Sequence, residues 1–211
     1  YGLVGSEMCI RDRGDEAEFE GHMLEVTLGP GMLSRNYDGL QNDLDKMEGV
    51  FLRRGEYTFP LDNDKLWDFK PLAKVGDKVA AGGWLGEVDE NFQPHKIMVP
   101  FTFKGEYTVK SLKEAGQYTI GEVIAVLTDE AGKDVEVTMI QRWPVKRAIT
   151  CYKEKPRPYK LLETGVRTID TVNPIVEGGT GFIPGPFGTG KTVLQHAISK
   201  QAEADIVIIA A

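Results

Sequence analysis

Apolar and polar residues alternate in two stretches that lie on either side of the middle of the chain. Residues 23–28 alternate and run into Gly29-Pro30-Gly31, and residues 135–140 alternate again. A period of two is typical of a strand with one buried face, and adjacent glycine and proline mark a tight turn. We therefore expect a strand and a turn at the first stretch, as the edge of a β-hairpin, and another strand at 135–140.

The segment between these strands contains a weak internal repeat. Val75-Gly76-Asp77 aligns with Ala115-Gly116-Gln117 at an offset of 40 residues, and residues 84–88 then align with residues 124–128. Each copy predicts a turn, a strand and a second apolar strand. Two such copies facing each other would form a small β-sandwich. Before the repeat, residues 42–48 favour a short helix, and residues 50–59 are rich in β-forming residues.

A carrier function must be weighed for this β-rich segment. Its pattern Gly-Asp-x-Val-x-x-Gly-x-x-Leu resembles biotinyl and lipoyl carrier domains, which makes Lys96 a candidate attachment point. Carriers hold that lysine at a hairpin tip, whereas Lys96 runs directly into an apolar stretch that ends at Pro100. A structural sandwich is favoured, and the carrier module stays open as an alternative.

Prolines punctuate the chain after the sandwich. Trp143-Pro144 and Lys155-Pro156-Arg157-Pro158 prevent helix formation and restrict the preceding residues, which predicts a domain junction near 141–160. A basic cluster in this region could contact phosphate or nucleic acid, but a solvated linker is the favoured interpretation. The cluster consists of Lys153, Lys155, Arg157 and Lys160.

Residues 161–211 follow the order of a βαβ unit: a helix, a short strand at 180–183, a glycine-rich loop, a helix and a final strand. This order predicts an α/β P-loop (RecA-like) nucleotide-binding domain, truncated at its end, that follows the β-rich segment. The loop matches Gly-x-x-x-x-Gly-Lys-Ser/Thr at every fixed position. The helix after it is expected to bury one face, formed by Val193, Leu194, Ala197 and Ile198.

Each residue type in the loop suits the binding of a nucleotide. Gly188 and Gly190 permit backbone angles that let successive N–H groups surround phosphate oxygens. Lys191 brings an ammonium to the β and γ phosphates, and Thr192 offers a hydroxyl to Mg²⁺ at the N-terminus of a helix. We therefore predict an ATP/ADP site with Mg²⁺, formed by Gly185, Pro186, Phe187, Gly188, Thr189, Gly190, Lys191 and Thr192.

Two polar residues near the loop are weaker candidates. His196 could be a catalytic base, but a lone histidine beside an apolar helix face usually packs or lies at the surface. Asp205 is expected at the start of the final strand, as a turn residue rather than a magnesium ligand. No acid in the chain is therefore expected to orient an attacking water.

Bulk properties narrow the class of protein. The 211 residues are 41% hydrophobic and 27% charged, which is typical of a globular protein, and the net charge of −7 disfavours nucleic-acid partners. The longest apolar run, residues 206–211, is far shorter than the roughly 20 residues that cross a bilayer. Two cysteines, Cys9 and Cys151, favour a reducing cytoplasm over a disulfide framework. Residues 1–13 are expected to be a non-native leader.

The loop sequence Gly-Pro-Phe-Gly-Thr-Gly-Lys-Thr resembles the catalytic A subunit of vacuolar and archaeal-type rotary ATPases, in which the Phe187-Gly188 pair is characteristic. Further resemblance to this family lies at residues 28–31, 37–41, 143–145, 164–170 and 176–179. The resemblance divides the chain into the strands that lead into the ATPase core (14–61), an inserted bulge (62–134), a connector (135–160) and the start of the P-loop domain (161–211).

This resemblance implies a subunit that alternates with B subunits in an A3B3 hexamer around a central rotor, with peripheral stalks and a membrane sector that moves H⁺ or Na⁺. The subunit would lie on the cytoplasmic face of the membrane. The family's catalytic glutamate and magnesium aspartate would follow residue 211, so the 211 residues by themselves are not expected to be an enzyme. Alternatives are another hexameric motor, such as a secretion or flagellar ATPase or an RNA helicase.

Overall fold

The computed structural model describes residues 21–47, 49, 51, 55–152 and 154–210. The chain divides into two compact units, residues Tyr1–Tyr152 and Lys153–Ala211. The expected leader at 1–13, with Cys9, lies outside the described residues, as do Lys153 of the basic cluster and parts of the 42–48 and 50–59 predictions. Among the residues that are described, no helix is both long and apolar enough to cross a membrane.

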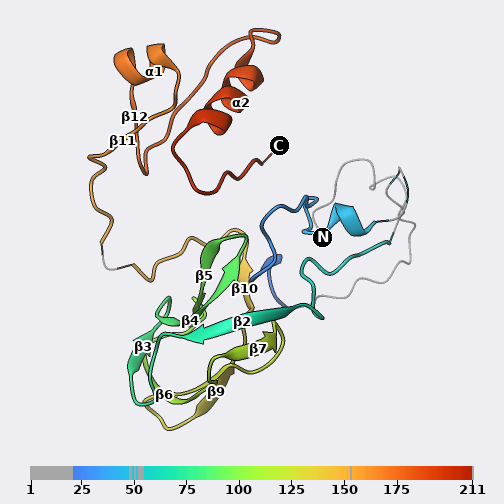
Figure 1. Cartoon of the computed structure of the whole chain (residues 1–211), viewed down its shortest axis with the longest axis vertical. Coiled ribbons are helices and arrows are strands. Elements are labelled where there is room, and N and C mark those ends of the chain that lie inside the picture. Colours follow the sequence, from blue (N-terminus) through green and yellow to red (C-terminus); the bar gives the residue numbers. More distant parts are fainter. Residues whose placement is uncertain (1–20, 48, 50, 52–54, 153, 211) are drawn as a thin grey trace. The chain divides into compact units, whose positions relative to one another are not determined.

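The first unit is built from β-strands and one short 3-10 helix, η1 (Figure 1). Its elements are β1 (Glu25–Leu28), η1 (Leu44–Lys46), β2 (Leu66–Pro71), β3 (Lys78–Ala80), β4 (Trp84–Glu90), β5 (Gln93–Met98), β6 (Glu106–Leu112), β7 (Gly116–Thr119), β8 (Ala125–Thr128), β9 (Asp134–Val137) and β10 (Gln141–Pro144). The strand predicted at 23–28 is confirmed as β1, whereas the strand predicted at 135–140 is present only up to residue 137, in β9. The helix expected at 42–48 shortens to η1, which Asp43 begins by accepting the N–H of Asp45 at 3.1 Å.

The internal repeat produces two four-stranded antiparallel sheets. One sheet has the order β5-β4-β2-β7, and the other has the order β3-β6-β8-β9. The offset found in the sequence relates β2 to β6, β4 to β8, β5 to β9 and β3 to β7. The predicted sandwich is therefore present, but each sheet takes one edge strand from the other copy. This exchange interlocks the copies, because each copy supplies three strands of one sheet and an edge strand of the other.

Two hydrophobic clusters fill this sandwich. The first contains Leu61, Trp67, Phe69, Val88, Ile97, Ile120, Ile124 and Met139, and the second contains Leu85, Val99, Val109, Ala125, Leu127 and Val137. Each fully buried large apolar side chain contributes about 1.5–3 kcal/mol. Both copies of the repeat supply residues to each cluster, which makes the sandwich a stable platform.

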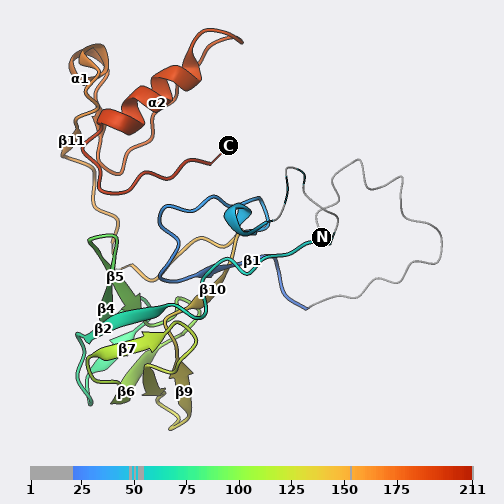
Figure 2. The same cartoon turned by 45° about the vertical axis from the view of Figure 1, so that its right-hand side comes forward.

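The strand that precedes the sandwich pairs with the strand that follows it. β1 and β10 are antiparallel, with Glu25 opposite Pro144 and Leu28 opposite Gln141 (Figure 2). The expected hairpin edge is therefore wrong, because the partner of β1 lies beyond the whole sandwich. The chain that follows β1 instead presents the Gln41 amide, which accepts from Thr27 N–H and donates to Thr27 O, both at 2.7 Å.

The second unit contains β11 (Leu161–Leu162), α1 (Arg167–Val172), β12 (Ile175–Val176) and α2 (Lys191–Gln201). The strands predicted at 180–183 and after Asp205 are wrong, since neither stretch is a strand here. Strands of a parallel sheet need neighbours for hydrogen bonding, and the described part of this unit offers them none. For the same reason the expected apolar face of α2 is not buried, and Val193 is 73% exposed.

A phosphate-binding loop as the candidate functional site

The glycine-rich loop at 185–192 leads directly into α2. Gly188 and Gly190 have φ angles of 82° and 83°, in the left-handed region that favours glycine. A Cβ added at either position would meet nothing within 4 Å, so the backbone conformation, not lack of space, requires glycine. Gly190 is also the N-cap of α2 and has no side chain to bond the first N–H groups of the helix.

The backbone N–H groups of this loop are available to a ligand. In the described chain, no N–H group from residue 187 to residue 193 donates to a protein acceptor. The first that does so is Leu194, which donates to Gly190 O at 3.0 Å. Successive free N–H groups at a helix N-terminus form a concave site of positive potential. The loop can therefore bind an anion of phosphate type.

The polar side chains of the loop turn back over its own carbonyl groups. Lys191 Nζ donates to Gly185 O and, at 3.1 Å, to Pro186 O. The Thr189 hydroxyl also donates to Pro186 O, at 2.8 Å, and a Cβ on Gly185 would lie only 2.7 Å from this hydroxyl. A side chain at position 185 would therefore displace the Thr189 hydroxyl from this position. The ammonium is held over the same loop whose N–H groups are free.

The residues present fit a nucleotide phosphate and supply one ligand for a magnesium ion. The loop offers free N–H groups, the Lys191 ammonium and the exposed Thr192 hydroxyl. No acidic residue lies in the first turn of α2, so nothing there repels phosphate. Among the described residues, no group of three or more His, Cys, Asp or Glu side chains could hold a metal ion. The residues that the sequence predicts for the phosphate site lie together in this one loop, and none of them is a carboxylate.

One polar cluster in this unit was missed in the sequence. Asp170 Oδ1 accepts from the Thr164 N–H at 3.0 Å and the Thr164 hydroxyl at 2.7 Å, and its Oδ2 accepts from the Gly165 N–H at 3.1 Å. These bonds, the Thr164 hydroxyl first, lower the pKa of Asp170. Thr164 is fully buried. A Thr-Gly pair followed by an aspartate at the start of a short helix was the available signal.

The weaker candidates take no part in this site. Lys96 lies in β5, where its ammonium bonds the Glu87 carboxylate and lies 5.1 Å from the centre of the Trp84 ring. It is not at a hairpin tip, so the structure contradicts a carrier lysine. His196 and Asp205 are both exposed.

One member of the basic cluster is also engaged within the unit. Lys160 forms an ion pair of 2.7 Å with Glu177, and this hydrogen bond raises the pKa of Lys160. A lysine that is held in this way is less available to an outside phosphate or nucleic acid than a solvated linker residue would be.

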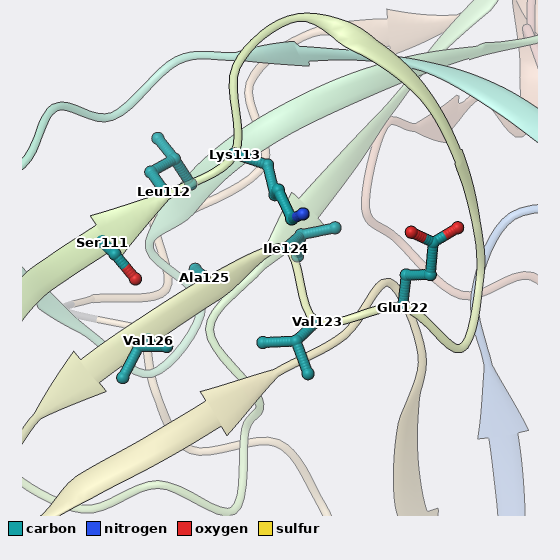
Figure 3. A pocket seen from close by; sticks show the side chains of 8 residues that line it. All are labelled: Ser111, Leu112, Lys113, Glu122, Val123, Ile124, Ala125 and Val126. Carbon is teal, nitrogen blue, oxygen red and sulfur yellow. The ribbon is translucent and has the colours of Figure 1, made fainter.

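A groove of the sandwich unit contains a carboxylate that already has hydrogen-bond donors. This groove of about 360 Å³ lies along the ends of β6 and β8, with Lys113 and Glu122 on the connecting loop (Figure 3). The Glu122 carboxylate is already bonded by the N–H and hydroxyl of Thr119, at 2.9 and 3.2 Å. The Glu122 carboxylate in this groove is therefore less available to a ligand than the free N–H groups of the loop.

Two family models match the chain, one in each unit. Residues 58–146 match the barrel-sandwich domain of ATP synthase alpha/beta subunits, and residues 165–211 match the nucleotide-binding domain of the ATP synthase alpha/beta family. Both matched domains are domains of ATP synthase alpha/beta subunits.

Within this family, the chain is a homologue of V-type ATP synthase alpha chains. It is 51% identical to the V-type ATP synthase alpha chain of Treponema denticola and 48% identical to V-type ATP synthase alpha chain 1 of Treponema pallidum; each alignment covers 94% of this chain and 34% of the relative. The corresponding protein of Borrelia garinii subsp. bavariensis is 50% identical, over 94% of this chain and 35% of the relative. The chain spans about a third of the length of these relatives. The resemblance seen in the sequence is confirmed.

Proposed function

We propose that the protein containing this chain is the catalytic subunit of a V/A-type rotary ATPase, which couples ATP hydrolysis or synthesis to transport of H⁺ or Na⁺ across a membrane. The observation that supports it is the loop at 185–192, whose free N–H groups and Lys191 ammonium suit a nucleotide phosphate. The relatives named V-type ATP synthase alpha chain support the same activity.

The loop residues have separate roles in this proposal. The N–H groups of 187–193 hold the phosphates of ATP or ADP, and the Lys191 ammonium neutralises charge that grows on the β and γ phosphates. The Thr192 hydroxyl is a ligand for Mg²⁺. A bound Mg²⁺ supplies charge neutralisation and orients the phosphate oxygens. Phe187, which is fully exposed, lies on the outer side of the loop, where it can contact the nucleotide or a neighbouring subunit.

The assembly around this subunit follows from the family. We propose that it alternates with B subunits in an A3B3 hexamer on the cytoplasmic face of the membrane and contacts a central rotor and peripheral stalks. The domain division proposed from the sequence is kept: 14–61 leads into the ATPase core, 62–134 is the inserted bulge, 135–160 connects, and 161–211 begins the P-loop domain. A net charge of −7 supports the absence of nucleic-acid partners.

Substitution of Lys191 tests this function in the assembled enzyme that contains the chain. We expect Lys191→Ala to lower the rate of MgATP hydrolysis by more than about a hundredfold, because charge stabilisation of the transferred phosphoryl group is lost. Lys200→Ala is the matched control, since Lys200 lies in the last turn of the same helix and should change the rate less than about twofold. A near-normal rate from Lys191→Ala would refute the site.

A further inference from the structure

The chain on both sides of the phosphate loop is attached to one short segment, residues 161–166. Upstream, β12 pairs with β11, so that Leu161 lies opposite Val176 and Leu162 opposite Ile175 (Figure 1). Downstream, the end of α2 contacts the turn that follows β11, because the Glu203 N–H donates to Glu163 O at 3.1 Å. The segment 161–166 therefore contacts both the strand that precedes the loop and the end of the helix that follows it.

Close packing reinforces the downstream attachment. Gly165 has a φ of +72°, and a Cβ added there would lie 2.7 Å from Gln201 Oε1 and 2.9 Å from Gln201 Cβ. Gln201 is the last residue of α2. The turn and the end of the helix are therefore in close contact.

A single carboxylate holds this turn in shape. Asp170 accepts three hydrogen bonds, two from Thr164 and one from Gly165, and the Thr164 hydroxyl also accepts from the Val166 N–H at 3.2 Å. Hydrogen bonds to a charged acceptor are stronger than those between neutral groups. Loss of the carboxylate would leave the buried Thr164 hydroxyl and two backbone N–H groups without their acceptor.

We propose that Asp170 is a positioning residue for the phosphate loop, acting through the Thr164-Gly165 turn on the far end of α2. The helix has 11 residues and is a rigid rod of about 16 Å, with Lys191 at one end and Gln201 at the other. A shift of the turn would therefore displace the Lys191 ammonium and the Thr192 hydroxyl, which are proposed to bind the phosphates and Mg²⁺. Displacements of about 1 Å at reacting groups can lower rates by up to about a hundredfold. This role rests on the proposed ATPase function.

The test is made in the assembled enzyme, with rates of MgATP hydrolysis and melting temperature measured for each variant. We expect Asp170→Ala to lower kcat about tenfold or more, with KM changed less than about threefold, because a small displacement of the helix weakens contacts made in the transition state more than it weakens substrate binding. Thr164→Val should lower kcat by a smaller factor, and Thr164→Ser, which keeps the hydroxyl, should restore it to within about twofold of the wild type.

Asp38→Ala is the matched control for a purely structural role. Asp38 also accepts three hydrogen bonds, from the N–H groups of Leu40 and Asn42 and from the Asn42 side chain, but it lies in the other unit. Equal kcat values for Asp170→Ala and Asp38→Ala would overturn the proposal. If Asp170→Ala does not fold, the comparison of Thr164→Val with Thr164→Ser takes its place. Equal kcat values for these two variants would overturn the positioning role.

The outcomes also separate this inference from the proposed function. If the Lys191→Ala variant hydrolyses MgATP at a near-normal rate, the proposed ATPase site is refuted. If Lys191→Ala is inactive while Asp170→Ala has the wild-type rate, the proposed ATPase function stands and only the positioning role of Asp170 is rejected.

Discussion

Glu90 is a carboxylate that the fold buries and then surrounds with donors. Its side chain is 3% exposed, and Oε1 accepts from the Gly31 N–H at 2.8 Å and the Leu33 N–H at 3.0 Å. Its Oε2 lies 2.7 Å from His95 Nδ1. A buried charge is costly unless it is paired and hydrogen-bonded. Glu90 thus ties the turn after β1 to the β4–β5 hairpin.

A pH dependence follows from these bonds. Burial raises the pKa of Glu90, but the hydrogen bonds from His95, Leu33 and Gly31 together lower it by more than burial raises it. The net pKa of Glu90 is therefore below its usual value. A depressed folded pKa means that the carboxylate stabilises the fold above its unfolded value, about 4.3, and that this stability is lost as the pH falls through the folded pKa.

Glu90→Gln should therefore destabilise the chain at pH 7 by about 1–3 kcal/mol, since charged hydrogen bonds are replaced by neutral ones. Urea unfolding at pH 7 and at pH 3 measures the difference from the wild type, which should shrink at the lower pH. Glu122→Gln, at an exposed turn, serves as the control. A difference that is the same at both pH values would contradict the role of the charge.

At the scale of elements, the β4–β5 hairpin contains an unfavourable turn. Asn91 and Phe92 have φ angles of 53° and 67°, as in a turn that normally contains Asn-Gly. The Phe92 N–H donates to Asp89 Oδ1 at 3.0 Å, yet its ring is 95% exposed. A non-glycine residue in the left-handed region costs about 1–2 kcal/mol.

Phe92→Gly should stabilise the first unit by about 1 kcal/mol, because it removes this strain and loses almost no buried area. Phe92→Ala removes the same ring but keeps a Cβ, so its stability should stay within about 0.5 kcal/mol of the wild type. Chemical unfolding of the three proteins makes the comparison. A glycine variant no more stable than the alanine variant would show that the turn is not strained.

The elements that the sequence predicted well are those whose signal is local. The offset of 40 residues predicted a sandwich, and the pattern at 185–192 predicted a loop before a helix. Pairing between distant residues could not be predicted in this way. The exchange of β3 and β7 between sheets and the pairing of β1 with β10 depend on contacts between residues far apart in the chain. The strand predicted at 180–183 was wrong because a strand depends on neighbours as well as on its own residues.

The two units differ in how much apolar surface they bury. Both hydrophobic clusters belong to the first unit, whereas the one buried residue among those described at 154–210 is Thr164. Ile208 and Ile209 in the second unit are 88% and 67% exposed. Burial of apolar area is the main source of stability, so the sandwich unit holds most of it.

Removal of the second unit should therefore leave the unfolding of the first unit unchanged. Residues 21–152 and residues 1–211 are expected to melt within about 2 °C of each other, because each large contribution to stability lies before residue 153. Calorimetry gives the melting temperatures. A fall in melting temperature of more than about 5 °C on deletion would instead mean that the phosphate-loop unit stabilises the sandwich.

In the longer protein, backbone amides at 154–210 should exchange with solvent much faster than those of β4 and β8, since local opening needs little exposure of apolar area. The 211-residue chain by itself should show no steady-state ATP hydrolysis, because a loop held by so little buried surface cannot keep Lys191 and Thr192 in place for phosphoryl transfer.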